Sequence, residues 1–288
     1  MGEADRDRPD PDVLTSLGVT DPECVARTPI ANVYRVLRPD RSPAALKIYH
    51  GPGLANEGPG LDYLAASRTT AAVKIYRRHG QAVLMEWLPG PSLGDLVRDG
   101  REDEASKCLA DVARHLHANA PEPPPDWPSL ETWFGALLTA SPTARCSERA
   151  RRDFIAAADF ARSLLASQPR HIALHGDLHH DNVRLGPRGW FAFDAKGIVG
   201  DPCYELANAF RNPKGAGDLL RDADVHRRRA SIWTAALGVA EDRLLAWAAA
   251  KCALSIAWRA KGEIGADPEF SLLAILLDLA RRAGFRAD

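Results

Sequence analysis

The chain has 288 residues, which is long enough to bury a sizeable core as one large domain or two modest ones. With 45% hydrophobic and 26% charged residues and a net charge of -1, it has the composition of an ordinary globular protein and no reason to bind nucleic acid or an anionic membrane. The five cysteines are scattered without a pairing pattern, which argues against a disulfide framework and favours a reducing compartment.

Residues 1–12 are charged and contain prolines, a pattern that predicts a flexible tail and not a secretion signal. The apolar runs further along the chain are too short or too interrupted by charge to span a bilayer. We therefore expect a cytoplasmic protein without a membrane partner. The sequence gives no sign of a protein partner.

The N-terminal third of the chain has the alternation of β-strands. A hairpin is predicted over residues 25–37, followed by a third strand over 44–49. Lys47 lies in the middle of that third strand, where an isolated lysine is usually on a solvated face. Two further strands, at 71–76 and 81–86, complete a five-stranded antiparallel sheet, and one helix is expected with it.

The segment 51–60 contains four glycines between the third strand and that helix. A dinucleotide-binding loop also lies between a strand and a helix, but Asn56 stands where its third glycine is required and no acidic residue follows about twenty positions later. The segment is therefore not predicted to bind a dinucleotide. Glu57 is an acidic residue of the type that the helix dipole favours in a first turn.

Beyond residue 88 the apolar residues change to helical spacing. Ser92, three residues before Asp95, predicts a helix start, and a proline-rich segment at 121–128 predicts a stiff connector. Further helices, with three tryptophans in their core, are predicted around residues 109–116, 154–165, 201–210, 224–237, 241–260 and 268–283, the tryptophans being 233, 247 and 258. Strands first and helices after indicate an α+β fold, divided into an N-terminal lobe at 13–88 and a helical C-terminal lobe at 89–288.

The segment 171–201, HIALHGDLHHDNVRLGPRGWFAFDAKGIVGD, contains a predicted hairpin set among the helices. Its two short strands, joined by a four-residue turn, cover residues 183–185 and 190–193. If Leu185 pairs with Trp190, the antiparallel register places Asn182 beside Asp194 at the open end of the hairpin.

Asp177 lies five residues before Asn182, so the side chains of Asp177, Asn182 and Asp194 converge on one small volume. Oxygen ligands of this kind suit Mg²⁺ shared with the phosphates of a substrate, and a remaining carboxylate can orient a nucleophile or accept its proton. This is the constellation of phosphoryl transfer. As separate turn residues the three would be ordinary, but that interpretation leaves their convergence unexplained. The neighbouring histidines lack a further ligand at zinc spacing and are interpreted as loop scaffolding: His175, His179 and His180.

His175-x-Asp177, with Asn182 five residues further on and a strand that ends in Asp194, is similar to the catalytic and metal-binding loops of protein-kinase-like phosphotransferases. LHGDLHHDN followed by FDAKGIVGDPCYELANAFRNP resembles more narrowly the aminoglycoside/hydroxyurea antibiotic resistance kinases, the streptomycin 6-phosphotransferase group. The resemblance implies a two-lobed kinase fold that binds ATP and Mg²⁺. It implies that Asp177 is the catalytic base and that Asn182 and Asp194 are the metal ligands.

The same resemblance assigns roles in the N-terminal lobe. Lys47 would reach the α- and β-phosphates of ATP, and Glu57 would pair with it. Glu86 and Leu88 would form the hinge between the lobes, where backbone groups meet the adenine edge. The turn at 28–32, in the place of the glycine-rich loop of protein kinases, contains no glycine, and no phosphate contact is expected from it.

Two acidic residues in the C-terminal lobe, Asp201 and Glu205, are candidates for binding a cationic acceptor. Asp201 followed by Pro202 also fits a helix N-cap, and the resemblance implies that Asp201 braces the catalytic loop. The predicted function is ATP-dependent phosphorylation of a small-molecule hydroxyl, on an aminoglycoside or aminocyclitol such as streptomycin.

Three other functions stay open at this point. The chain fits a metabolic kinase that acts on a sugar or an amino alcohol. Because the phosphate turn lacks glycine, it also fits a nucleotide-binding pseudokinase. A metal-dependent phosphohydrolase that uses Asp177, Asp194 and the histidines is the third alternative.

Overall fold

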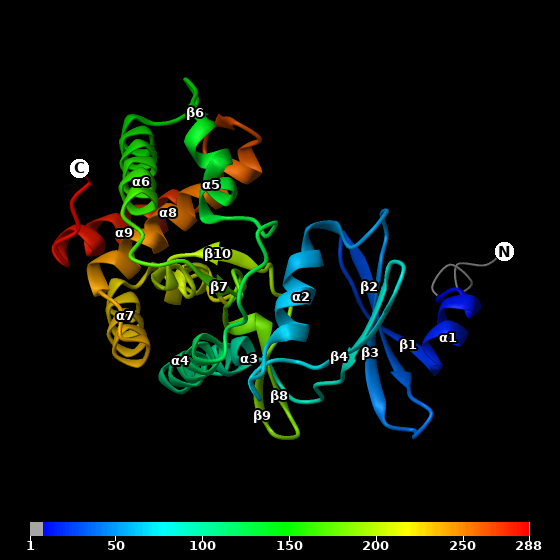
Figure 1. The fold of residues 1–288 in the computed structure, drawn as a ribbon. Helices are drawn as coiled ribbons and strands as arrows, with labels where there is room; N and C mark the ends of the chain where they lie inside the picture. Colours follow the sequence, from blue (N-terminus) through cyan, green and yellow to red (C-terminus); the bar gives the residue numbers. More distant parts are fainter. Residues whose placement is uncertain (1–7, 288) are drawn as a thin grey trace.

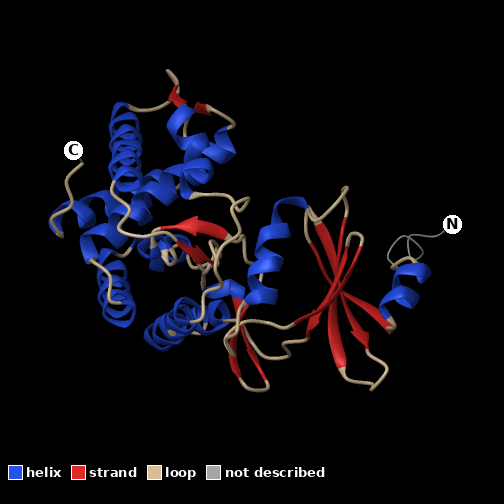
Figure 2. Ribbon diagram, in the orientation of Figure 1, coloured by secondary structure: helices blue, strands red, loops and turns tan. Residues whose placement is uncertain are grey.

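In a computed structural model, which describes residues 8–287, the chain forms an N-terminal antiparallel sheet beside a larger helical part (Figures 1 and 2). The strands of the sheet are β1 (Thr20–Arg27), β2 (Ala31–Leu37), β3 (Pro43–Tyr49), β4 (Ile75–His79) and β5 (Ala82–Glu86). They lie in the order β1-β2-β3-β5-β4, with all neighbours antiparallel. The predicted α+β fold with a five-stranded sheet is confirmed.

The fourth strand begins at Ile75, later than the predicted start at residue 71. The residues before it pair with the C-terminal hairpin: Val73 N–H donates to Ala192 O at 3.0 Å and Ala192 N–H donates to Ala71 O at 2.8 Å. The sheet and the hairpin are thus joined by backbone hydrogen bonds. Alternation alone does not reveal which sheet a short extended segment will join.

Two α-helices accompany the sheet, where one was predicted. The additional helix, α1 (Pro11–Leu17), begins inside the expected tail because the Asp10 side chain accepts from Asp12 N–H at 2.9 Å and Pro11 occupies the first turn. Leu17 joins a small apolar cluster on the sheet. Residues 1–7 of the expected tail lie outside the described part of the chain.

The second helix, α2 (Gly58–Ala66), lies between the sheet and the helical part (Figure 1). Its first turn touches the segment after Asp194 so closely that a Cβ on Gly60 would overlap the carbonyl oxygen of Ala195. Gly197, at φ 64°, meets the carbonyl group of Pro59 in the same way. Here glycine serves close packing between two backbones.

The helical part contains seven α-helices within the described residues: α3 (Leu93–Arg98), α4 (Glu102–Ala118), α5 (Leu130–Thr139), α6 (Glu148–Ala166), α7 (Ala223–Leu237), α8 (Glu241–Ala260) and α9 (Phe270–Arg282). The capping box that Ser92 and Asp95 form at the start of α3 is as predicted. Helix α5, capped by Ser129, was not predicted. A short parallel pair of strands, β6 (Ser141–Pro142) and β11 (Glu263–Ile264), joins two of its loops.

Two further expectations for this part were wrong. Residues 201–210 form two short 3-10 turns, Pro202–Tyr204 and Ala207–Arg211, instead of one helix. Trp233 and Trp247 are fully buried as expected, but Trp258 is 42% exposed. Across residues 8–287, the helices are too short or too polar to cross a membrane.

Four short strands lie between the helices and the sheet (Figure 2). They are β7 (Ile172–Leu174), β8 (Val183–Gly186), β9 (Gly189–Ala192) and β10 (Ile198–Gly200), paired as β7 with β10 and β8 with β9. Leu185 pairs with Trp190, which confirms the predicted register. The turn has two residues instead of four because Gly186 and Gly189 also pair. Phe193 N–H donates to Asn182 O at 3.0 Å, so Asn182 and Asp194 are neighbours at the open end.

Candidate active site

Lys47 on β3 and Glu57 just before α2 form a buried ion pair. The Nζ–Oε2 distance is 2.6 Å, and the Tyr49 hydroxyl donates to the same oxygen at 2.6 Å. Burial works against the Lys47 charge, but the carboxylates of Asp194 and Glu57 outweigh it and raise the pKa of Lys47. The lysine is therefore held charged at the junction of the sheet and the helical part.

Asp194, which follows β9, faces Lys47 from the other side. Its Oδ1 lies 2.9 Å from Lys47 Nζ, and its side chain keeps 39% exposure. Its φ of 59° is in the left-handed region, where residues other than glycine are uncommon. Backbone strain of this kind clusters at functional sites, and here it turns the carboxylate out of the hairpin toward Lys47.

The loop between β7 and β8 presents Asp177. Asn208 Nδ2 donates to Asp177 Oδ1 at 2.6 Å, and Asn182 Nδ2 donates to the Asp177 backbone oxygen at 3.0 Å. Oδ1 of Asp177 is thus anchored. Because the amide nitrogen of Asn182 is used in this contact, its carboxamide oxygen is the atom that could bind a metal ion. The carboxylate and carboxamide oxygens of Asp194 and Asn182 are the donors that Mg²⁺ prefers, so this pair fits that ion.

His175 ties the loop to the strand that delivers Asp194. Its Nδ1 accepts from Asp177 N–H at 3.3 Å, so Nε2 carries the proton and donates to Phe193 O at 3.0 Å. Burial of the ring lowers the pKa of His175, which favours this neutral form. His179 also has a scaffolding contact, accepting from Asp181 N–H at 3.2 Å.

Glu205, predicted to bind a cationic acceptor, is instead enclosed by the protein at 1% exposure. It accepts from the backbone N–H groups of His175 and Gly176, each at 3.0 Å, and from His117 Nε2 at 3.3 Å. Burial opposes its charge, but the contacts with His117 and the loop lower the pKa of Glu205. The prediction is corrected: this carboxylate holds the backbone of the loop between β7 and β8.

Asp201 is likewise fully buried, at 0% exposure, and has no route to an acceptor. Its side chain accepts from Cys203 N–H at 2.9 Å, as expected of a cap, and from Trp247 Nε1 at 2.9 Å, and it pairs with Arg243 at 2.5 Å. The expectation of direct substrate contact is therefore corrected for Asp201 too. The capping interpretation agrees with its contacts.

Glu86 and Leu88 lie where β5 leaves the sheet toward α3. The Glu86 carboxylate pairs with Arg188 at 2.9 Å, and Gly90 N–H donates to Leu185 O at 2.9 Å. Leu88 is buried against Gly186 of β8. The connection is thus held to the hairpin, and contact of its backbone with adenine stays a prediction.

Two neighbouring cavities meet at Asp177. One, of about 420 Å³, is lined by residues that include all three predicted catalytic and metal-binding side chains: Asp177, Asn182, Asp194, His179, Asp181, Arg98, Lys196 and Lys214. The other, of about 490 Å³, is lined by Asp177, Asn56, Thr132, Trp133, Ala136, Lys196, Lys251 and Trp258. The first suits phosphates and a metal, and the second has the polar and aromatic groups that bind an organic molecule.

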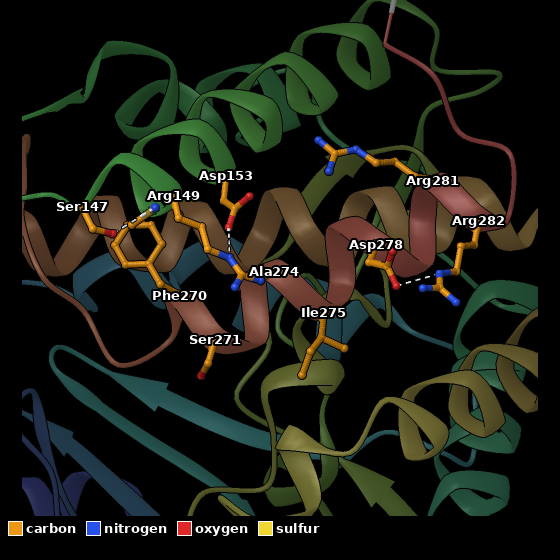
Figure 3. Close-up of a pocket in the computed structure, with 11 residues that line it drawn as sticks. Ser147, Arg149, Asp153, Phe270, Ser271, Ala274, Ile275, Asp278, Arg281 and Arg282 are labelled. Atoms are coloured by element: carbon orange, nitrogen blue, oxygen red, sulfur yellow. Dashed lines mark hydrogen bonds and ion pairs between the residues drawn. The ribbon is translucent and has the colours of Figure 1, made fainter.

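A third cavity, of about 670 Å³, lies between α6 and α9 (Figure 3). Figure 3 shows charged side chains around it that pair within their own helices, with Arg149 3.8 Å from Asp153 and Arg282 2.8 Å from Asp278. None of the predicted site residues lines it. The three side chains predicted for catalysis and metal binding thus line the cavities at Asp177 and not this one.

The fold and this constellation define a protein-kinase-like phosphotransferase. Residues 18–262 match the family described as aminoglycoside/hydroxyurea antibiotic resistance kinase. The chain belongs to this family, and its enzymatic activity is phosphoryl transfer, as the recognised motifs implied.

Individual relatives agree with this assignment. The chain is 36% identical to the streptomycin 3''-kinase of Klebsiella pneumoniae, over 75% of this chain and 79% of the relative, and 29% identical to the streptomycin 6-kinase of Streptomyces griseus, over 78% and 74%. Among solved structures, a choline/ethanolamine kinase family protein from Mesorhizobium loti has a TM-score of 0.60 at 14% identity, covering 90% of this chain and 93% of that one. A thermostable aminoglycoside phosphotransferase mutant in complex with ADP and hygromycin B has a TM-score of 0.58 at 12% identity. The match covers 96% of this chain and 98% of that one. At these identities the solved structures support the fold alone.

Sequence reasoning missed four residues at the site: Lys196, Asn208, Trp133 and Lys251. Lys196 stood inside the recognised FDAKG segment, two residues after Asp194, so its proximity was a usable signal. Asn208 stood further along the same quoted segment, although its contact with Asp177 is visible only in the folded chain. Trp133 lies on an unpredicted helix and Lys251 on a helix far along the chain, and no local pattern indicates these two.

Proposed function

We propose that this protein transfers the γ-phosphoryl group of ATP to a hydroxyl of an aminoglycoside or aminocyclitol such as streptomycin. The observation that carries the proposal is the position of the Asp177 carboxylate, which lines both the cavity with Asn182 and Asp194 and the tryptophan-lined cavity beside it. The two streptomycin kinases among the relatives support the acceptor class. Because Asp201 and Glu205 are buried, acidic groups at these positions do not contribute to that support.

In this proposal ATP lies between the lobes at 13–88 and 89–288. Lys47 binds the α- and β-phosphates, with Glu57 orienting its ammonium group. The backbone around Glu86 and Leu88 binds the adenine edge. Asn182 and Asp194 would hold Mg²⁺, which supplies positive charge to the phosphates when it is bound.

Asp177 acts on the acceptor. Asn208 engages its Oδ1, so Oδ2 is the oxygen that accepts from the acceptor hydroxyl. As the acceptor oxygen forms its bond to the γ-phosphorus, the bond to the β–γ bridging oxygen breaks, ADP leaves, and the hydroxyl proton passes to Asp177. Positioning and electrostatics provide most of the rate in such a reaction.

The test is ADP release from Mg-ATP with streptomycin, other aminoglycosides, hydroxyurea, sugars, choline and ethanolamine as acceptors. We expect release that depends on an aminoglycoside, phosphorylated product by mass spectrometry, and a loss of roughly 10³-fold or more in Asp177→Asn with nucleotide binding retained. Asp218→Asn, at a fully exposed carboxylate of the same lobe, is the matched control.

Each alternative has its own outcome. Turnover only with a sugar or an amino alcohol would replace the acceptor class and keep the phosphotransferase. Phosphate released without any acceptor would indicate a hydrolase, and ATP binding without turnover would indicate a pseudokinase. Full activity in Asp177→Asn would remove Asp177 from the role of base.

We also propose a cytoplasmic location. It is supported by five cysteines that are all free thiols in the fold, as a reducing compartment requires, and by the availability of ATP there. Cell fractionation with an antibody against the native protein tests this, and recovery outside the cytoplasmic fraction would contradict it.

A further inference from the structure

Lys196 occupies a position that the proposed function has not used. Its backbone is fixed to the catalytic loop, because Lys196 N–H donates to His175 O at 2.7 Å. Its side chain is 15% exposed, and Nζ lies 3.0 Å from Glu57 Oε1. Glu57 therefore holds two lysines with one carboxylate, Lys47 at Oε2 and Lys196 at Oε1.

Asp177 and Lys196 are the two residues that line both cavities at the site. One cavity contains the predicted metal ligands, and the other contains the tryptophans. With the nucleotide in the first cavity and the acceptor in the second, both side chains border the volume in which the phosphoryl group is transferred. The carboxylate of Asp177 can accept the proton of the acceptor hydroxyl. The ammonium group of Lys196 can stabilise the negative charge of the phosphoryl group.

The charge and hydrogen-bonding capacity of Lys196 fit that task. An ammonium group has three N–H donors, and Glu57 accepts from one of them. The pKa of Glu57 is lowered because the charges of Lys47 and Lys196 outweigh the effect of burial, so the carboxylate remains charged and keeps both ammonium groups oriented. The β1–β2 turn at 28–32 lacks the glycines of a phosphate-binding loop. Cationic side chains from other segments must therefore neutralise the charge of the phosphates.

We propose that Lys196 is a catalytic residue that binds the γ-phosphoryl group during its transfer. The proposal rests on the proposed phosphoryl transfer, but not on the identity of the acceptor. Lys196 donates to a non-bridging γ-oxygen while the acceptor oxygen bonds to phosphorus, the bridging oxygen departs with ADP, and Asp177 takes the proton. Lys47, in contrast, serves the α- and β-phosphates that ATP and ADP share.

The difference between the two lysines can be measured without an acceptor. The experiment compares the Kd values of Mg-ADP and of Mg-AMP-PNP, a non-hydrolysed triphosphate, by titration calorimetry in wild type, Lys196→Met, Lys196→Arg and Lys47→Met. We expect Lys196→Met to weaken AMP-PNP about tenfold or more and to leave ADP within about twofold. Lys47→Met should weaken both nucleotides, and Lys196→Arg should retain part of the preference for the triphosphate. Lys74→Met, at an exposed lysine near β4, is the control with unchanged Kd values.

Turnover provides a second readout with any acceptor that the wild type phosphorylates. We expect kcat in Lys196→Met to fall by about 10²–10³-fold, as for loss of one charge-stabilising donor, with the acceptor KM within about threefold. An unchanged AMP-PNP Kd with kcat within threefold of wild type would overturn the proposal. Equal weakening of ADP and AMP-PNP would also overturn it, because it would indicate that Lys196 acts only by holding Glu57 in place.

Failure of the proposed acceptor class can be distinguished from failure of the Lys196 proposal. If no tested compound stimulates ADP release in the wild type, the proposed acceptor class fails while the nucleotide-binding comparison still decides the role of Lys196. Thermal unfolding of each variant distinguishes local loss of a contact from loss of the fold, and Lys196→Arg keeps the test decisive if Lys196→Met is poorly folded.

Discussion

Asn208 donates a 2.6 Å hydrogen bond to Oδ1 of Asp177. Its own carboxamide oxygen accepts from Arg211 at 2.8 Å, and Arg211 in turn pairs with Glu269 at 2.6 Å. Because the arginine can only donate, the amide nitrogen of Asn208 must face Asp177. A chain of contacts that ends at Glu269, the residue just before α9, thus fixes the orientation of the proposed base.

Removing this support should slow the reaction without changing nucleotide binding. We expect Asn208→Ala to lower kcat by about 10- to 100-fold with the ATP KM within twofold, because a misoriented carboxylate loses the attack geometry. Steady-state kinetics measures this, with the exposed Asn119→Ala as control. An unchanged kcat would show that Asp177 needs no anchor.

The glycines of α2 offer a matched pair of substitutions. A Cβ on Gly60 would overlap the carbonyl group of Ala195, whereas a Cβ on Gly58 would meet nothing within 4 Å. We expect Gly60→Ala to destabilise the protein by about 1–3 kcal/mol and to raise the ATP KM by displacing Glu57. Gly58→Ala should be neutral or stabilising by up to about 1 kcal/mol. Denaturant unfolding compares the two, and equal stabilities would refute the close-packing role.

The burial of Glu205 predicts an effect on stability and not on acceptor binding. Glu205→Gln replaces a buried carboxylate that accepts from two backbone N–H groups and His117, and should cost about 2–4 kcal/mol at pH 7. The acceptor KM should stay within about twofold. A raised acceptor KM with unchanged stability would restore the original prediction of substrate contact.

The pH dependence of this effect follows from the lowered pKa of Glu205. The contribution of its charge is present above the ordinary glutamate pKa, about 4.3, and is lost as the pH falls through the lower folded-state value. The difference in unfolding free energy between wild type and Glu205→Gln should therefore shrink on acidification. A difference that grows toward low pH would contradict the assignment.

For Lys251 on α8 we expect a pH dependence of stability that comes from a buried amine instead of a buried carboxylate. It is 3% exposed, donates to Ser255 Oγ at 3.0 Å and lies 4.6 Å from the ring centre of Trp258. Burial and, next, the charge of Arg211 lower the pKa of Lys251 to about 7 from its ordinary 10.5. Between these values the unfolded chain binds the additional proton, so the contribution of Lys251 to stability becomes more favourable as the pH rises.

Lys251→Met should therefore be more stable than wild type by several kcal/mol below pH 7, with an advantage that declines toward pH 10. Urea unfolding at pH 6, 8 and 9.5 measures the difference, with the exposed Lys107→Met as control. The lysine lines the tryptophan-lined cavity, and groups kept at a cost in stability are typical of functional sites. A pH-independent difference would show that Lys251 has an ordinary pKa.

Features of the site that depend on short-range geometry were predictable from the residues alone. The register of Leu185 with Trp190 sets Asn182 beside Asp194, because strand pairing has a period of two residues and one hairpin contains both partners. Family resemblance added the pairing of Lys47 with Glu57, which the 2.6 Å contact agrees with.

Which polar groups face a cavity became clear only from the packing of distant elements. The sequence suggested that the Asp201 carboxylate is available to a substrate. In the fold it is buried, and Trp247, from a helix about forty residues further on, donates to it. Asn208 and Lys251 likewise reach the site through packing of segments that are distant from Asp177 in the sequence. Burial depends on how distant helices pack, and that packing is set by the sum of many weak apolar contacts, so no local pattern in the chain encodes it.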